Sequence, residues 1–343
     1  QCGQSECRGQ RAGIVKTVRR IWFGETLYKD AQSEFLAELH HMGQLFGFVP
    51  VRRDEEPTEV CLFNIPITDV INIFLSSRLR NLPRFAVITE PTIVLPHLSW
   101  PIWKVIFPYL FWLGKASSSK AMYSKPHAYP KKVDFPRVGD RLETSVLING
   151  NKLSMVKGEL YTLRRQLIFG LDNLNVYGSG WTAPHGKRIL VAVKQGIIAL
   201  ASPGKMTFGA RRLFVIPESY CGQAADKNQT LGKYRIALAI ENSQEILTEK
   251  LLDAWMAGCI PIYVGPTLGD FRIPDGLAIE CGASVEEVRE GIRQALNLDH
   301  EAFLSKLKDW LFNESTVSQW SWEPSWRRIF DIDVSLPPGE PTV

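Results

Sequence analysis

Short apolar runs alternate with segments of helical periodicity, and this alternation occurs twice along the chain. In the first half, Ile14–Trp22 has the composition of a strand, and Asp30–Phe46 carries apolar residues at helical spacing that end at Gly47. The other elements expected in this half are strands at Val49–Val51, Cys61–Phe63 and Phe85–Ile88 and a helix at Ile67–Leu79. This order of elements is typical of βαβ units on a parallel sheet.

The second half repeats the pattern after residues 115–140, which are rich in serine, lysine and proline and are expected to form a linker. Its expected strands are Ser145–Ile148, a short one around Val176, Leu190–Val193, Tyr234–Ile240, Ile260–Val264 and Leu277–Glu280. Its expected helices are Gly158–Leu171, one that begins at Glu249, and Val285–Leu296. The chain is therefore predicted to be an α/β protein with two Rossmann-like halves. The tryptophans near its end, Trp310, Trp320, Trp322 and Trp326, are expected to pin a terminal segment to both halves.

Composition narrows the class of protein. Hydrophobic residues make up 45% and charged residues 22% of the 343 residues, which is enough apolar material for about two packed domains. The formal net charge of +4 is small and argues against a partner that is a nucleic acid. The six cysteines are scattered without the spacing of a zinc site, which favours a reducing compartment.

The most apolar stretch is Ile93–Leu113. Prolines, a histidine and a lysine interrupt it, so a membrane-spanning helix is not expected. A buried loop with a short helix is the favoured interpretation, and a peripheral contact with a membrane is the alternative. The chain opens without methionine and without a secretory signal, so we expect its N-terminus to be incomplete.

Polar residues follow a buried strand most conspicuously in residues 234–266. The apolar run Tyr234–Ile240 predicts a strand that is buried on both faces. Turn residues come directly after it, namely Glu241, Asn242 and Ser243. Thr248 is then a suitable N-cap for a helix that ends at Gly258, before the next strand. These polar residues are therefore expected at the carboxyl edge of a parallel sheet, where ligands bind in open α/β folds.

Glu249 and Lys250 lie in the first turn of that helix, where free backbone N–H groups and the helix dipole favour an anion. Lys250 can neutralise phosphate oxygens as a leaving diphosphate gains charge. Glu249 can accept hydrogen bonds from the diol of a sugar or a ribose. The structural alternative is a capping glutamate beside a solvated lysine.

This segment resembles the donor-site motif of the α-1,3/1,4-fucosyltransferase family, glycosyltransferase family 10. The matching residues cover about a tenth of the chain and are Glu241-Asn242-Ser243, Thr248-Glu249-Lys250, Ala257-Gly258, Pro261 and Gly265-Pro266. A weaker resemblance lies upstream, at Asn151, Lys152 and Arg164, with Arg165 as the neighbour that could replace Arg164. In the family this arginine faces the donor diphosphate, and a guanidinium suits phosphate oxygens.

The resemblance implies the GT-B arrangement, in which two Rossmann-like domains face each other across a cleft. Residues 1–140 are then the acceptor-side domain with the linker, residues 141–312 the donor domain and residues 313–343 a terminal segment that packs back across the domains. The implied activity is an inverting transfer of L-fucose from GDP-fucose to an oligosaccharide hydroxyl, with an α-1,3-type linkage. The implied location is the cytoplasm or a membrane periphery in a bacterium, or the Golgi lumen in a eukaryote whose anchor has been lost.

The family also implies a general base and no metal. Glu90 follows the strand that begins at Arg84 and resembles the family's proposed base, which takes the proton of the acceptor hydroxyl; a local cap or salt bridge is its alternative role. Asp270 and Asp275 do not form an Asp-x-Asp pair, so we expect no tightly bound cofactor and no obligatory metal. Lys250 and Arg164 would hold the diphosphate instead.

Two features depart from the family pattern. The family places tyrosine three residues before the position of Glu249, where its hydroxyl reaches the donor phosphate, but this chain has Ile246. Residues 97–135 also lack the expected acceptor-side pattern, so the acceptor and the oligomeric state stay open. The alternatives are a GT-B transferase that uses another nucleotide sugar and an inactive carbohydrate-binding or scaffold relative.

Overall fold

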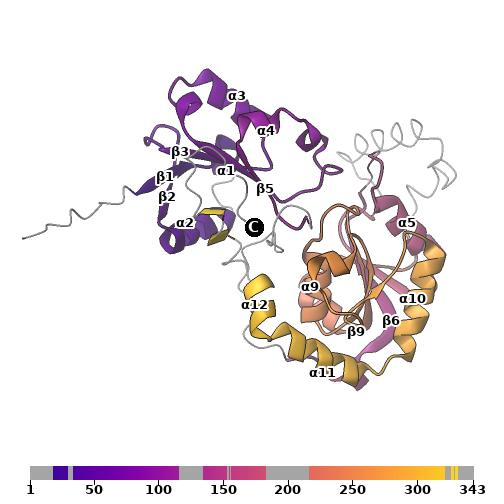
Figure 1. The fold of residues 1–343 in the computed structure, drawn as a ribbon. Helices are drawn as coiled ribbons and strands as arrows, with labels where there is room; N and C mark the ends of the chain where they lie inside the picture. The colour runs from indigo at the N-terminus through magenta and orange to yellow at the C-terminus, as the bar shows by residue number, and fades with distance from the viewer. Residues whose placement is uncertain are drawn as a thin grey trace, which may run out of the picture. The chain divides into compact units, whose positions relative to one another are not determined.

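The computed structural model describes residues 18–29, 34–115, 134–152, 154, 156–182, 216–320, 326–327 and 329–330 (Figure 1). Some expected features lie outside the described residues. They are residues 14–17, most of the linker, the strand Leu190–Val193 and Trp322. The chain divides into two compact units, Gln1–Leu62 with Pro66–Arg84 and Phe63–Ile65 with Phe85–Val343. The domain boundaries expected at residues 140 and 312 stay predictions.

The first sheet has five strands in the order β2-β1-β3-β4-β5. They are β1 (Arg19–Trp22), β2 (Phe48–Val51), β3 (Glu59–Phe63), β4 (Arg84–Ile88) and β5 (Tyr109–Trp112). The pairs β1–β2, β1–β3 and β4–β5 are parallel. This is the order of flavodoxin-like, doubly wound sheets.

The helices of the first half are α1 (Glu25–Lys29), α2 (Glu34–Phe46) and α3 (Ile67–Leu75), followed by the 3₁₀ turn η1 (Leu79–Asn81). Helix α2 ends at Gly47, where a φ of +73° favours glycine, as expected. Helix α3 was expected to continue to Leu79 but ends at Leu75. The backbone of Ser76 is extended, and its hydroxyl accepts a hydrogen bond from the Leu79 N–H at 3.3 Å, which competes with a further helical turn.

The apolar stretch Ile93–Leu113 contains a strand that the sequence analysis did not predict. The 3₁₀ turn η2 (Pro96–Ser99) and α4 (Trp103–Ile106) form the expected loop and short helix. Strand β5 then pairs with β4 from Phe85↔Tyr109 to Ile88↔Trp112. Its four apolar residues are too few to show an alternating pattern, so only pairing with a neighbour defines it as a strand.

The crevice of the first sheet is expected between the carboxyl ends of β1 and β3, and a carboxylate of the protein occupies the helix start there. Asp69 is 1% exposed and accepts hydrogen bonds from the backbone N–H groups of Glu25 (2.9 Å) and Thr26 (3.3 Å). Gly24 permits this approach, because a Cβ at its position would lie 2.6 Å from Asp69 Oδ2. A phosphate would meet this carboxylate, which disfavours an anionic ligand at α1.

The second sheet has six strands in the order β11-β10-β9-β6-β7-β8, which is the Rossmann order. They are β6 (Leu142–Ile148), β7 (Leu174–Tyr177), β8 (Tyr220–Gly222), β9 (Tyr234–Ile240), β10 (Ile260–Val264) and β11 (Ile279–Glu280). All its neighbouring pairs are parallel. The predicted α/β fold class with two Rossmann-like sheets is confirmed, although the short edge strand β8 was not predicted.

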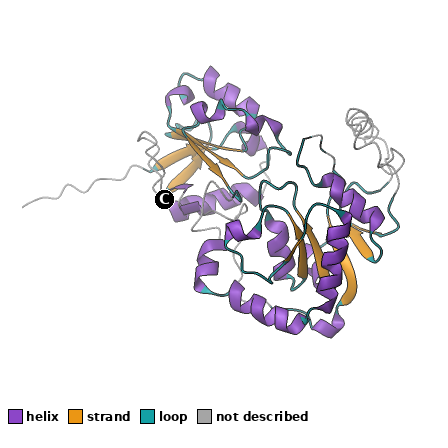
Figure 2. Cartoon of the chain, turned by 45° about the vertical axis from the view of Figure 1, so that its right-hand side comes forward, coloured by secondary structure: helices purple, strands orange, loops and turns teal. Residues whose placement is uncertain are grey.

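Helices lie on both faces of the second sheet (Figure 2). The helices of this half are α5 (Tyr161–Gly170), α8 (Lys227–Gly232), α9 (Glu249–Met256), α10 (Val285–Asn297), α11 (His300–Leu311) and α12 (Glu314–Trp320). Helix α9 lies on one side of β6 and β9, and α5 and α10 lie on the other (Figure 1). In the part of the chain that the structure describes, no helix is long and apolar enough to span a membrane.

Helix α9 packs against the sheet through one apolar stripe. Leu251, Ala254 and Trp255 are each at most 1% exposed, and the indole N–H of Trp255 donates to the carbonyl of Leu277 at 2.7 Å. The helix gives way to Gly258, whose φ is +71° and where a Cβ would lie 2.7 Å from a nitrogen of Arg141. The glycine is therefore needed both for the turn and for the close approach.

Aromatic contacts fix Trp310, Trp326 and Phe330. Trp326 stacks on Phe330 at 5.8 Å and packs against Phe63 at 5.6 Å, and Phe330 meets Phe85 edge-on at 5.9 Å. Trp310 packs edge-on against Trp255 at 5.0 Å. These tryptophans serve packing, as expected, and the side chain of Trp320 lies outside the described residues.

We predict that His300 makes stability depend on pH. Its Nε2 donates to the carbonyl of Gly258 at 2.9 Å, and its Nδ1 is buried without a hydrogen-bond partner among the described residues. Burial lowers the pKa of His300 below its ordinary value, because a second N–H would have no acceptor. The unfolded chain then binds the proton more readily, so the free energy of unfolding is highest above pH ~6.5 and falls as the pH drops below that value.

Urea unfolding of the wild type and of His300→Gln at pH ~7.5 and ~5.5 checks this. The glutamine amide can still donate to Gly258 but does not titrate, so the loss of stability at low pH should be smaller in the variant. An equal loss in both proteins would contradict the prediction.

Candidate functional site

The second sheet reverses its winding between β6 and β9, which lie side by side although β7 and β8 separate them in the chain. Ser145 pairs with Ile236, and Val146 with Ala237. In doubly wound sheets the ligand binds at the carboxyl ends of two such strands. Those ends lead directly to predicted donor-binding residues, namely Asn151 and Lys152 after β6 and Glu241, Asn242 and Ser243 after β9.

The carboxylate of Glu241 is fully buried, and the protein engages both of its oxygens. Oε1 accepts a hydrogen bond from the backbone N–H of Thr248 at 2.8 Å, and Oε2 accepts one from the Thr248 hydroxyl at 2.6 Å. The ammonium group of Lys250 lies 3.4 Å from Oε2. A buried carboxylate is stable only when it is paired and hydrogen-bonded, so the loop between β9 and α9 is folded around this group. A direct contact of Glu241 with a donor stays a prediction.

Gly265 makes room for this carboxylate. A Cβ at residue 265 would lie 2.3 Å from the hydroxyl of Tyr263 and 2.7 Å from Cγ of Glu241. The Tyr263 hydroxyl is buried and has no hydrogen-bond partner in the described part of the chain. Burial raises its pKa far above the ordinary value, so this hydroxyl stays neutral beside Glu241. The motif therefore has glycine at position 265 because a side chain there would clash with Tyr263 and Glu241.

The start of α9 differs from the expectation in one respect. Thr248 holds the N-cap position, but its hydroxyl makes no capping hydrogen bond and binds Glu241 instead. The ammonium group of Lys250 binds the same hydroxyl at 2.8 Å. Glu249 lies in the first turn, with Oε1 at 4.0 Å from the ammonium group of Lys227. The threonine side chain thus leaves the first N–H groups of α9 to other acceptors.

Arg164 connects α5 to the residues that follow β9. It is 3% exposed, and its Nη2 donates to the carbonyl of Ile240 at 2.6 Å and to Oδ1 of Asn242 at 2.9 Å. Its guanidinium lies over the ring of Tyr161 at 4.9 Å. Burial lowers the pKa of Arg164 to about 10, so it stays charged at neutral pH. Arg164 therefore fixes the side chain of Asn242.

Arg165 is also buried, at 4% exposed, but its guanidinium is less well paired. Its Nε and Nη2 have no hydrogen-bond partner among the described residues, and it lies 5.9 Å from the ring of Trp181. Burial lowers its pKa to about 10. The indole of Trp181 donates to the carbonyl of Asn149 at 2.6 Å, which places this pair beside the end of β6. Unused N–H groups on a buried cation are what an anionic ligand would satisfy.

Asn151 and Lys152 lie on the loop after β6. The backbone N–H of Asn151 donates to the carbonyl of Ser179 at 2.8 Å, and its side-chain amide donates to that of Gly180 at 2.9 Å. Its Oδ1 is buried without a partner in the described ranges. Lys152 is exposed. Asn151 therefore joins the loops after β6 and β7 and keeps one acceptor unused.

Glu90 follows β4, as predicted. Asn64 holds its backbone, because Oδ1 of Asn64 accepts hydrogen bonds from the N–H groups of Thr89 (2.8 Å) and Glu90 (3.2 Å). Burial raises the pKa of Tyr161; the charge of Arg164 opposes this rise and that of Glu90 adds to it. Glu90 therefore lies within electrostatic range of Tyr161 in α5, and both residues belong to the second unit.

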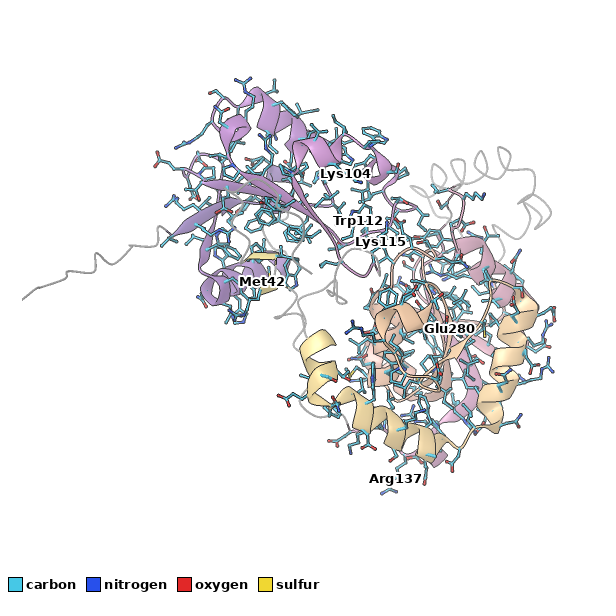
Figure 3. The ribbon with its side chains drawn as sticks, viewed as in Figure 1. Met42, Lys104, Trp112, Lys115, Arg137 and Glu280 are labelled. Atoms are coloured by element: carbon cyan, nitrogen blue, oxygen red, sulfur yellow. The ribbon has the colours of Figure 1, made fainter. Side chains whose placement is uncertain are left out.

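Glu245 is a residue of the site that was not predicted from the sequence. Its Oε2 accepts hydrogen bonds from the hydroxyl (2.8 Å) and the backbone N–H (3.2 Å) of Thr92. Its Oε1 pairs with the ammonium group of Lys115 at 3.2 Å, and that group lies over the ring of Trp112 at 4.7 Å (Figure 3). Glu245 thus joins the segments after β4 and β5 to the loop after β9. It lies outside every motif position, so the sequence offered no signal for it.

Ile246, which stands where the family has tyrosine, is a core residue at 1% exposed. The backbone N–H of Leu247 donates to the carbonyl of Gly114 at 2.8 Å. A Cβ on Gly114 would lie 2.9 Å from Cγ2 of Ile246. Position 246 therefore supplies packing in this chain and no hydroxyl.

Within the described ranges, no group of three or more His, Cys, Asp and Glu side chains is arranged to hold a metal. Asp270, in the 3₁₀ turn η5 (Leu268–Phe271), and Asp275, on the loop after it, belong to no such group. A reaction without a metal stays a prediction. The protein cations that could hold the diphosphate in place of a metal are Arg164, Arg165 and Lys250.

We predict that Glu241→Gln destabilises the protein by about 3 kcal/mol, because the partly buried Lys250 loses its charge partner and an amide N–H faces another donor. The measurement is the free energy of unfolding in urea. Glu143→Gln is the matched control, since Glu143 pairs with Arg235 on the same sheet but its side chain is 66% exposed. A change of less than ~0.5 kcal/mol is expected there. Equal effects in the two variants would refute the anchoring role of Glu241.

No family model and no curated protein matches the sequence. Among solved structures, the chain is similar to Anabaena HepE in complex with UDP and glucose, with a TM-score of 0.51 and 11% identity over 89% of this chain and 83% of that chain. An α1,3-fucosyltransferase gives a TM-score of 0.47 at 12% identity over 94% and 93%. The lipopolysaccharide outer core galactosyltransferase WaaB gives 0.42 at 12% over 88% and 82%. At such identity the likeness to HepE concerns the fold alone, and the fold class is GT-B, as predicted.

Proposed function

We propose that the chain is an inverting glycosyltransferase that binds a nucleotide-sugar donor at the carboxyl ends of β6 and β9. The observation that carries the proposal is the network around Glu241. It holds Lys250 at the start of α9, beside the reversal point of a Rossmann-ordered sheet. Ligands of such sheets bind at this point, and a helix start with a lysine favours a phosphorylated ligand.

The charges of the site suit a diphosphate. The first N–H groups of α9, the ammonium group of Lys250 and the unused N–H groups of Arg165 all carry positive charge. The diphosphate gains negative charge as its bond to the sugar breaks, so these groups stabilise the transition state more than the bound donor. Arg164 acts through Asn242, whose side chain it orients. Glu249 would accept hydrogen bonds from a diol of the donor.

We propose GDP-fucose as the donor. The support is the family motif, whose residues have physical roles here: Glu241 anchors the loop, and Gly265 makes room for it. The second candidate is a UDP-sugar, because HepE, which shares the fold, was crystallised with UDP and glucose. Ile246 provides no hydroxyl for a phosphate, so the motif alone does not decide between the two donors.

We propose Glu90 as the general base that takes the proton from the acceptor hydroxyl, which attacks the anomeric carbon as the diphosphate leaves from the opposite side. The support is its position directly after β4 and its electrostatic effect on Tyr161 in α5, the helix that also carries Arg164. The acceptor is proposed to be an oligosaccharide, with an α-1,3-type linkage.

The donor assignment predicts that the wild type binds GDP more tightly than UDP and releases fucose from GDP-fucose. Lys250→Ala should weaken GDP binding by ~10–100-fold, because one charge-assisted hydrogen bond to a phosphate is lost. Isothermal titration calorimetry measures both affinities, and a panel of nucleotide sugars measures donor release.

Lys233→Ala is the matched control, because Lys233 is an exposed lysine at the opposite end of β9, and it should bind GDP as the wild type does. Tighter binding of UDP than of GDP would replace the proposed donor by a UDP-sugar. A panel in which no nucleotide binds would favour an inactive carbohydrate-binding relative. Unchanged GDP affinity in Lys250→Ala would remove Lys250 from the phosphate site.

Glu90→Gln should lower kcat by ~10²–10⁴-fold and leave the affinity for the donor unchanged, because only the proton acceptor is lost. Steady-state kinetics with the donor identified above gives kcat, and titration calorimetry gives the affinity. Asp54→Asn is the control, since Asp54 is an exposed carboxylate on the turn after β2. Turnover at the wild-type rate would show that another group takes the proton.

A further inference from the structure

A short segment of the second unit exposes three large apolar side chains. Between η2 and the end of α4, Trp100 is 50% exposed, Ile102 47% and Val105 76%. Lys104 lies among them and is exposed as well (Figure 3). Single exposed apolar residues are ordinary, but three within six residues form a patch that calls for a partner.

Buried side chains hold the patch in place. The ring of Trp100 stacks on that of Trp103 at 5.8 Å with an interplanar angle of 15°. Trp103 is 4% exposed, and its indole N–H donates to the carbonyl of His97 at 2.6 Å. Nε2 of His97 lies 3.0 Å from the carbonyl oxygen of Ile65. The indole of Trp100 therefore rests on a buried layer and keeps its outer face available.

The segment that carries the patch has no acidic residue of its own. Residues 91–115 contain no aspartate and no glutamate, and Lys104 is exposed among the apolar side chains of the patch. A surface that combines exposed apolar side chains with a lysine is complementary to an anionic lipid headgroup layer.

We propose that the segment Trp100–Val105 docks on the surface of an anionic lipid bilayer. The indole of Trp100 would lie at the headgroup level, Ile102 and Val105 would enter the acyl boundary, and Lys104 would contact lipid phosphates. The proposal goes beyond the transfer reaction and does not depend on the identity of the donor.

Two other occupants fit the patch less well. A carbohydrate would use Trp100 as a stacking platform but needs hydrogen-bonding side chains beside it, whereas Ile102 and Val105 are aliphatic. A second copy of the chain would need roughly 800 Å² per partner, more than a six-residue segment offers.

Co-sedimentation of the full chain with phospholipid vesicles tests the proposal. The wild type should bind vesicles that contain phosphatidylglycerol, bind vesicles of phosphatidylcholine alone more weakly, and lose affinity as salt screens Lys104. The triple substitution Trp100→Ser, Ile102→Ser and Val105→Ser should lower the affinity for the anionic vesicles by at least ~10-fold. Lys104→Glu alone should lower it several-fold, which keeps the test available if the triple variant does not fold.

The matched control is Leu296→Ser with Leu298→Ser, two apolar residues that are 40% and 41% exposed at the end of α10. It should bind vesicles as the wild type does. Failure of the wild type to bind anionic vesicles would overturn the proposal, as would full binding by both patch variants. Loss of binding in Ile71→Ser with Leu75→Ser would overturn it too, because it would assign the contact to the exposed face of α3. If a patch variant binds vesicles as the wild type does but self-associates less, the patch would be assigned to a second copy of the chain. If it binds vesicles normally but has a higher KM for the acceptor, the patch would be assigned to a glycan.

Discussion

The buried carboxylate of Glu241 sets the conformation of the loop that follows β9. An ionised carboxylate removed from water costs several kcal/mol unless hydrogen bonds and an opposite charge compensate it. Thr248 supplies two hydrogen bonds and Lys250 the charge, so the backbone must turn back on itself within a few residues. Gly265 has no side chain because a Cβ would occupy the space of this carboxylate. Several residues of the sequence motif are therefore consequences of one buried charge.

The charged side chains at the crevices of the two sheets differ in sign. In the first sheet, Asp69 occupies the start of α1 and leaves no positive charge for a phosphate. In the second sheet, burial lowers the pKa of Arg164 and Arg165 to about 10, which records the cost of keeping these cations away from water. Arg164 donates hydrogen bonds to Ile240 and Asn242, which offset part of this cost. Two nitrogens of Arg165, in contrast, have no hydrogen-bond partner among the described residues. An anion at the second sheet would relieve this cost, and the first sheet offers no comparable gain.

Burial on both faces made the centre of the second sheet predictable. Strands β9 and β10 were predicted with the bounds that they have, because apolar runs bounded by turn residues and glycine mark such strands. Strands β5 and β8 were not predicted, since pairing with a neighbour defines a short edge strand and its own pattern does not. The sequence also placed the polar residues of the site at the right edge of the sheet. It could not show that Thr248 binds Glu241 rather than capping α9, because this depends on the room that Gly265 leaves.

The loop after β9 also controls the residues that follow β4. Glu241 holds Lys250 at one end of this loop, and Glu245 binds Thr92, two residues beyond Glu90. The proposed base and the proposed phosphate ligand are thus positioned through two carboxylates that are four residues apart. Between them and α9, Ile246 packs against Gly114, where an apolar side chain fits the closely approaching backbone.

This packing explains why position 246 carries an isoleucine where the fucosyltransferase motif that the sequence resembles has a tyrosine. The hydroxyl that the family uses there would donate a hydrogen bond to the donor phosphate, and an isoleucine cannot. Arg165 has the donors that could take its place, because its Nε and Nη2 are buried and unused in the described structure. A guanidinium also brings a charge that a phenol lacks, so the exchange would preserve hydrogen bonding and strengthen the attraction for a diphosphate. On the proposed function, Arg165 of α5 would supply the hydrogen bonds that the resemblance places at position 246.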